Sequence, residues 1–83
     1  MTAWLHRRGK PSWKFVPSQR YGELVHITKK GTVYAIIADH KCGKPFWVGR
    51  LCDRSWVTWE DQLSAHSIEF DGAGVYTFQR GLR

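Results

Sequence analysis

Apolar and polar positions follow strand-like patterns in the middle of the chain. Residues 24–28 and 32–38 are mainly apolar runs separated by Lys29, Lys30 and Gly31, and a glycine readily takes the positive φ that a short hairpin turn requires. Both faces of the second run are largely apolar, which is typical of a strand covered on both sides. The pattern therefore predicts an antiparallel hairpin whose second strand lies inside a sheet.

A third strand is predicted over residues 46–52. Pro45 fits only the start of this run, because proline cannot donate a hydrogen bond to a ladder. Further along, residues 67–70 and 75–78 are two short apolar runs on either side of a glycine-containing turn at 71–74. They predict a second hairpin at the end of the chain.

A short helix is predicted between these two groups of strands. Thr58 stands three residues before Asp61, a spacing that resembles a capping box for a helix over residues 59–66. The apolar positions of that segment recur at helical spacing. The alternative interpretation makes residues 56–59 a strand.

The segment before these elements is predicted to be a basic arm. Residues 1–22 contain Pro11 and Pro17 together with several Lys and Arg, which disfavours a helix. Residues 13–16 include aromatic and apolar side chains that could add an edge strand. We therefore expect a basic N-terminal arm or edge strand over 1–22 and one compact β-rich domain over 23–83.

The predicted order is strand, strand, strand, helix, strand, strand. This order predicts a small α+β domain with a five-stranded antiparallel, barrel-like sheet and one short helix, as in the OB barrel. A small barrel that counts residues 13–16 as a strand fits almost as well, and so does a three-stranded sheet backed by one helix. At 83 residues, the chain has room for a single core.

Charge is distributed unevenly along this chain. The formal net charge is +6, but residues 1–50 hold ten basic side chains against two acidic ones, and residues 51–83 hold three against five. Five Trp, three Tyr and four Phe are interleaved with these charges. Lys and Arg neutralise phosphates and exposed rings stack on bases, so this mixture favours nucleic-acid binding.

A non-enzymatic protein that binds single-stranded or structured nucleic acid is the function that the sequence predicts. In a barrel the ligand would cross the second and third strands between basic loops. The arm could add phosphate contacts. The residues expected to bind are Arg7, Arg8, Lys10, Lys29, Lys30, Tyr34, Lys41, Lys44, Trp47 and Arg50.

The alternative is a protein-binding module or inhibitor, for example virus-encoded, that occupies a surface of a larger machine. Trp, Tyr and Arg are enriched at the energetic centres of protein interfaces, so the same composition serves that role. Nuclease treatment of a lysate before capture would separate the two hypotheses.

Other classes of function have less support in the sequence. His40, Cys42, Cys52 and His66 lack the paired spacing of a zinc site, and no motif of a catalytic nucleophile or phosphate loop is present. We expect no metal, cofactor, small-molecule substrate or catalytic activity. The early charges leave no room for a signal peptide and no run is long enough for a membrane span, which predicts a cytoplasmic protein, or a nuclear one in a eukaryote.

Overall fold

The N-terminal segment forms two strands in the middle of the sheet. The computed structural model of the protein describes residues 1–38 and 45–77. β1 (Ala3–Arg7) and β2 (Lys10–Pro17) form an antiparallel hairpin whose turn contains Gly9 at φ +66°. The prediction of a basic arm before the sheet is therefore wrong. The apolar side chains of this segment are part of the core, and the free energy gained by burying them exceeds the cost of the two prolines.

The prolines are placed where the β1–β2 ladder does not need their missing N–H groups. Pro11 lies in a register irregularity, because Leu5 pairs with Trp13 whereas Arg7 pairs with Lys10. Pro17 is the last residue of β2. A strand accepts proline at bulges and ends, so neither residue prevents Lys10–Pro17 from pairing.

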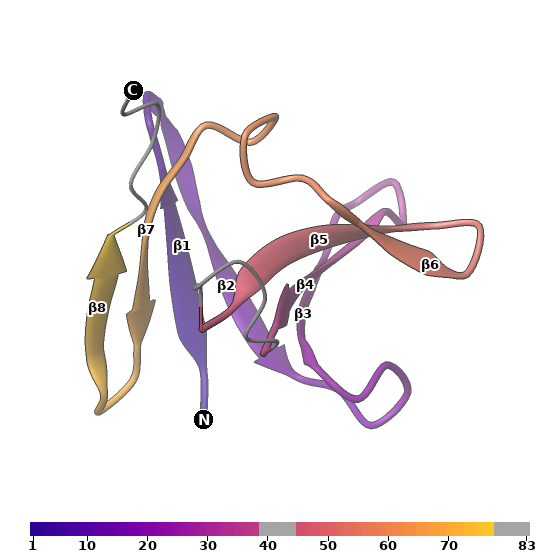
Figure 1. Ribbon diagram of the computed structural model, residues 1–83, viewed down its shortest axis with the longest axis horizontal. Coiled ribbons are helices and arrows are strands. Elements are labelled where there is room, and N and C mark those ends of the chain that lie inside the picture. The colour runs from indigo at the N-terminus through magenta and orange to yellow at the C-terminus, as the bar shows by residue number, and fades with distance from the viewer. Residues whose placement is uncertain (39–44, 78–83) are drawn as a thin grey trace.

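Eight strands and no helix make up the described residues (Figure 1). Six strands follow the first hairpin: β3 (Leu24–Ile27), β4 (Val33–Ile37), β5 (Trp47–Cys52), β6 (Ser55–Thr58), β7 (Ala65–Phe70) and β8 (Gly74–Thr77). Their order in the sheet is β6-β5-β4-β3-β2-β1-β7-β8, and every neighbouring pair is antiparallel. The sheet curves into a half-barrel, which corrects the predicted five strands and one helix.

The two halves of the half-barrel meet at β2. This strand pairs with β1 over most of its length, but only Val16 and Pro17 pair with β3. The concave faces of both halves share one core, whose buried members are Ala3, Leu5, Phe15, Ile36, Val48, Leu63, Ala65 and Ile68. Packing across this core therefore joins the halves where the ladder is short.

The predicted helix over residues 59–66 is replaced by a single turn. The Leu63 N–H bonds the Trp59 carbonyl, but Ser64 then takes a φ of +55° and the Ala65 N–H bonds the Glu60 carbonyl. The Ser64 N–H also bonds the Asp61 carbonyl. These bonds form a Schellman motif, which normally ends a helix and here stops the chain after one turn. No described residue belongs to a helix that could cross a membrane.

The turn is held in place by contacts that the local sequence does not reveal. Glu60 is 7% exposed and its carboxylate accepts a hydrogen bond from the Val48 N–H at 3.0 Å. The Trp59 N–H donates to the Val48 carbonyl at 2.8 Å. These bonds tie the segment to β5, so residues 55–58 pair as a strand and β7 starts directly after the turn.

The hairpins predicted from the apolar runs are confirmed. β3 and β4 are joined by a turn with Gly31 at φ +89°, and β7 and β8 pair with Ile68 opposite Tyr76. β4 lies between β3 and β5, and most of its side chains are buried, as expected of a strand covered on both faces.

Phe15→Ala tests whether the N-terminal segment belongs to the core. Phe15 has no exposed surface, so the change should lower the free energy of unfolding by about 3–5 kcal/mol. Urea denaturation followed by Trp fluorescence measures it. Val16→Ala is the matched control, because Val16 is 42% exposed and should change stability by less than about 1 kcal/mol. Equal, small effects of both changes would contradict the interior position of β2.

Candidate nucleic-acid interface

Three hairpin turns place basic side chains along one rim of the half-barrel. Because consecutive strands are antiparallel, the β1–β2, β3–β4 and β5–β6 turns all lie at the same end of the sheet (Figure 1). We call this rim the basic edge; its exposed cations are Arg8, Lys10, Lys29, Lys30 and Arg54. The segment before β7 joins the rim, since the Arg8 N–H bonds the Ser64 carbonyl at 3.0 Å.

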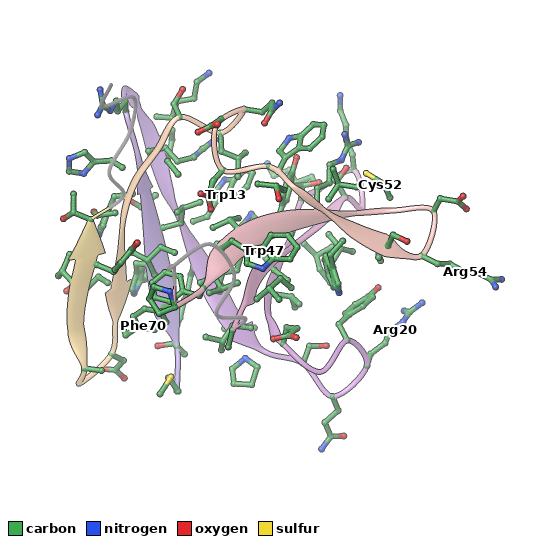
Figure 2. All side chains as sticks on the ribbon, viewed as in Figure 1. Trp13, Arg20, Trp47, Cys52, Arg54 and Phe70 are labelled. Carbon is green, nitrogen blue, oxygen red and sulfur yellow. The ribbon has the colours of Figure 1, made fainter. Side chains whose placement is uncertain are left out.

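Arg54 reaches the basic edge through an unusual turn. Asp53 and Arg54 have φ of +50° and +68°, as the two central residues of a type I′ hairpin turn require. Such positions favour Asn and Gly, and an arginine in this conformation is strained by about 1 kcal/mol. Figure 2 shows Arg54 pointing outward from the tip of the hairpin. The sequence analysis missed Arg54 because it predicted no turn after β5.

A stack of three side chains lies behind the β1–β2 turn. The Arg7 guanidinium lies 4.2 Å from the centroid of Trp13, and the other face of Trp13 stacks on His26 at 4.4 Å with an interplanar angle of 13°. Arg7 also donates two hydrogen bonds to the Pro11 carbonyl, at 3.0 and 2.9 Å. His26 donates from Nδ1 to the Lys14 carbonyl at 3.1 Å. The stack thereby bridges β2 and β3 beyond the end of their ladder.

A second cation lies deeper on the same concave face. Arg50 is directly opposite Tyr34 in the β4–β5 ladder, and its guanidinium lies 4.9 Å from the centroid of Trp59. The Arg50 Nε is buried and has no hydrogen-bond partner in the described part of the chain. A buried donor of this kind costs free energy until an acceptor binds it. We call these six residues the cation–aromatic layer: Arg7, Trp13, His26, Tyr34, Arg50 and Trp59.

The two indole rings of this layer lie against guanidinium groups. Trp13 is covered on one face by Arg7 and on the other by His26, and Tyr34 packs against it at 4.8 Å. One face of Trp59 is covered by Arg50. Trp13 therefore offers no open face for a base, and both indole rings hold guanidinium groups in position.

The structure brings most of the residues expected from the sequence to one end. Arg7, Arg8, Lys10, Lys29, Lys30, Tyr34 and Arg50 belong to the basic edge or to the cation–aromatic layer behind it. Trp47 does not, because β5 pairs in regular register and Trp47 lies on the face opposite Arg50. Lys41 and Lys44 lie outside the described residues.

Trp47 covers the convex side of the β3–β6 half of the sheet. With Leu51, Tyr21 and Trp56, its side chain packs on a second buried cluster, which consists of Val25, Val33, Ala35 and Ile37. A Cβ on Gly49 would lie 2.8 Å from the Trp47 ring, so Gly49 leaves the room that this ring needs. The β4–β5 ladder is regular at Gly49, so the glycine serves packing and forms no bulge.

The cations of the described residues are not neutralised by carboxylates. Across residues 1–38 and 45–77, the ion pair formed is between His6 and Glu69, at 3.2 Å, and it involves no Lys or Arg. Arg20 and Lys14, which the sequence analysis did not select, lie elsewhere, over Tyr21 and Trp4 respectively. Trp4 is 41% exposed and lies on the convex face of β1. The sequence alone does not distinguish these two cations from those of the basic edge, because their positions depend on how the strands pair.

A row of polar side chains crosses β2, β1 and β7 on that convex face. His6 bonds Ser12 Oγ through Nδ1 at 2.8 Å and Glu69 through Nε2 at 3.2 Å. The order hydroxyl, imidazole, carboxylate is that of an activated nucleophile. Here the side chains lie on an open sheet face, with His6 and Glu69 40% and 55% exposed, so the row links neighbouring strands without enclosing a substrate.

Within residues 1–38 and 45–77, no cluster of side chains supports metal or cofactor chemistry. No group of three or more His, Cys, Asp or Glu side chains is close enough there to hold a metal ion. Cys52, at the end of β5, is a partly buried free thiol. His40 and Cys42 lie outside the described residues.

Comparison of the chain with protein-family models, curated proteins and solved structures finds no match.

Gly49→Ala tests the packing of Trp47. The added methyl group must displace the ring, so the change should lower the free energy of unfolding by about 1–3 kcal/mol. In a Trp47→Leu background the same change should cost markedly less, because the branched side chain does not extend over residue 49. A double-mutant cycle by urea denaturation measures the coupling. Equal costs in both backgrounds would show that the ring does not determine the choice of glycine.

Proposed function

We propose that this protein binds nucleic acid through phosphate contacts at the basic edge, without catalysis. Lys and Arg that are not paired with carboxylates gain most from a polyanion, because each phosphate contact releases condensed counterions. The basic edge has five such exposed side chains on three turns, with Arg7 and Arg50 behind them. The placement of these unpaired cations along one rim is the observation that carries the proposal.

The arrangement of the rings favours phosphates over bases as the principal contact. An arginine stacked on an indole keeps its plane fixed, and its remaining N–H groups can point at a phosphate oxygen as a fork. Arg7 over Trp13 and Arg50 over Trp59 both have this arrangement. We infer that binding depends weakly on base sequence, as it does when contacts to the backbone dominate.

Two unfavourable features support a binding role for the same rim. The left-handed backbone at Arg54 and the unsatisfied Nε of Arg50 each cost stability, in a chain small enough to be only marginally stable. Strain and unsatisfied groups cluster at functional sites more than elsewhere. A bound phosphate could accept hydrogen bonds from the terminal N–H groups of Arg50 and use the charge of Arg54.

A protein partner is the second candidate, and a different surface favours it. Trp4, Val16 and Val75 are 41%, 42% and 63% exposed on the convex face of β1, β2 and β8. Glu69 lies between Trp4 and Val75 in the sheet, so the face combines exposed apolar side chains with one charge, as interaction surfaces do. An acidic protein could also bind the basic edge. Capture from a nuclease-treated lysate, followed by purification of a stoichiometric partner, would then favour this candidate.

Removing two lysines from the β3–β4 turn tests the interface. In Lys29→Gln/Lys30→Gln, the slope of log Ka against log salt concentration should become shallower by about 0.7 for each lysine that contacts a single strand. Fluorescence anisotropy of labelled 12-nucleotide DNA and RNA between two salt concentrations measures the slope. Trp13 should contribute little quenching of Trp emission, because both of its faces are covered.

The control for that experiment loses the same charge elsewhere. Lys14→Gln/Arg20→Gln removes two cations that lie away from the basic edge, over Trp4 and Tyr21. It should leave the slope close to that of the wild type. If both double variants lose affinity and slope equally, the protein responds to net charge and has no interface at the basic edge.

Arg50→Met separates a binding role from a structural one. Met keeps an apolar chain beside Trp59 and removes the unsatisfied Nε, so the free energy of unfolding should stay constant or rise by up to about 1 kcal/mol. Affinity for the DNA 12-mer should fall several-fold.

Arg7→Met is the comparison: it breaks two hydrogen bonds to Pro11 and a stack on Trp13, and should cost about 1–3 kcal/mol of stability. Destabilisation by Arg50→Met with unchanged affinity would assign Arg50 to the fold.

A further inference from the structure

A second site lies at the opposite end of the half-barrel from the basic edge. A cavity of about 700 Å³ opens between the two halves of the sheet, beside the β2–β3 loop. Leu24 and Ile36 line it from one half and Phe70 from the other, with Phe46 and Ala38 next to them. Cavities of 300–1,000 Å³ with mainly apolar walls are typical of small-molecule sites. The size and lining therefore fit a ligand.

The walls of the cavity are held in position without a ligand. Phe46 makes edge-on contacts with Phe70 and Tyr76, with ring centroids 5.1 and 4.6 Å apart. Ile36 belongs to the main core and is 4% exposed. Rigid walls lower the entropic cost of binding, because few side chains have to be ordered when the ligand enters.

The loop that forms one side of the mouth is also ordered by hydrogen bonds. The Ser18 N–H bonds the Glu23 carbonyl at 3.0 Å, and the Gly22 N–H bonds the Ser18 carbonyl at 2.8 Å. Gly22 takes a φ of +73°, which allows the chain to turn back into β3. The loop consequently positions residue 23 at the cavity.

Among the described residues that line this cavity, Glu23 is the one with a charged side chain. No Lys or Arg of the described residues forms an ion pair with its carboxylate. The other described side chains of the lining are apolar or uncharged, so Glu23 supplies the side-chain charge at this mouth. In a protein of net charge +6, this cavity therefore presents a negative side chain beside apolar walls.

We propose that the cavity binds a small cationic amphiphile, a molecule with an apolar chain or ring and one ammonium group. The apolar part fills the space between Leu24, Ile36 and Phe70, and the ammonium group pairs with the Glu23 carboxylate. The sequence carries no motif for such a ligand, because the described walls of the cavity come from β2, β3, β4 and β7 and from segments outside the strands. The cavity shares no residue with the basic edge, so this site and the nucleic-acid interface can each be present without the other.

Three probes of equal chain length test the chemistry of the site. We would titrate the full chain with n-octylamine, 1-octanol and octanoate, below their aggregation concentrations, and follow the backbone amide signals by heteronuclear NMR. Octylamine should bind roughly tenfold more tightly than octanol, as expected for one charge-assisted hydrogen bond, and octanoate should bind most weakly. Shifts should be largest for residues 17–24, Ile36 and Phe70.

Two substitutions assign these affinities to the cavity. Glu23→Gln keeps the shape of the side chain and should remove the preference for the amine over the alcohol. Asp53→Asn is its matched control: it removes the same charge from the far β5–β6 turn, where a positive φ suits Asn, and should leave all three affinities unchanged. A preference that survives Glu23→Gln, or that Asp53→Asn also abolishes, overturns the role of Glu23.

Blocking the mouth tests the cavity itself. Ala38→Trp adds a large ring at an exposed lining position and should weaken all three probes at least tenfold while leaving DNA binding intact. Gln19→Trp, on the opposite lip, provides the same test if Ala38→Trp does not fold. Lys29→Gln/Lys30→Gln should leave octylamine binding unchanged. Failure of every probe to bind the wild type, or binding that neither blocking variant reduces, overturns the proposal and leaves the nucleic-acid interface untouched.

Discussion

The short ladder between β2 and β3 is the constraint on which the rest of the structure depends. β2 pairs with β1 over most of its length but meets β3 at only Val16 and Pro17, so the two halves of the sheet diverge beyond that point. Burial of Phe15 against the opposite half replaces the missing hydrogen bonds. The Trp13–His26 stack does the same near the rim. A continuous ladder would flatten this junction and remove the concave face that holds the cation–aromatic layer.

The diverging halves give the molecule two chemically different ends. Antiparallel connection brings three basic turns to one rim, where Arg7 and Arg50 lie against indole rings. The other end opens on an apolar cavity with Glu23 at its mouth. Both ends contain features that cost stability, an unsatisfied Nε at one and unfilled apolar space at the other.

The apolar and polar pattern of the sequence correctly predicted hairpins, whose two strands are neighbours in the chain. The β3–β4 and β7–β8 hairpins follow from apolar runs flanking glycine turns, because each turn joins neighbouring strands. The N-terminal segment was misjudged because Pro11 and Pro17 were read without knowledge of the ladder that accommodates them. The helix at 59–66 was misjudged because the bonds from Glu60 and Trp59 to β5 are not visible in the local pattern. Trp47 was placed with the binding residues because alternation alone leaves open which face is covered.

By itself, the amino-acid sequence determined that the chain is a small, strand-rich domain with an excess of cations in its first fifty residues, since composition and period-two patterning depend on neighbours in the chain. Tertiary structure alone decided which cations converge, which rings are covered and where a cavity remains. These properties depend on the pairing of β1 with β7 and on packing between the two halves of the sheet. Both bring together residues that are far apart in the sequence, such as Ala3 and Phe70. Such contacts are set by the summed burial of the whole core, so no local segment encodes them.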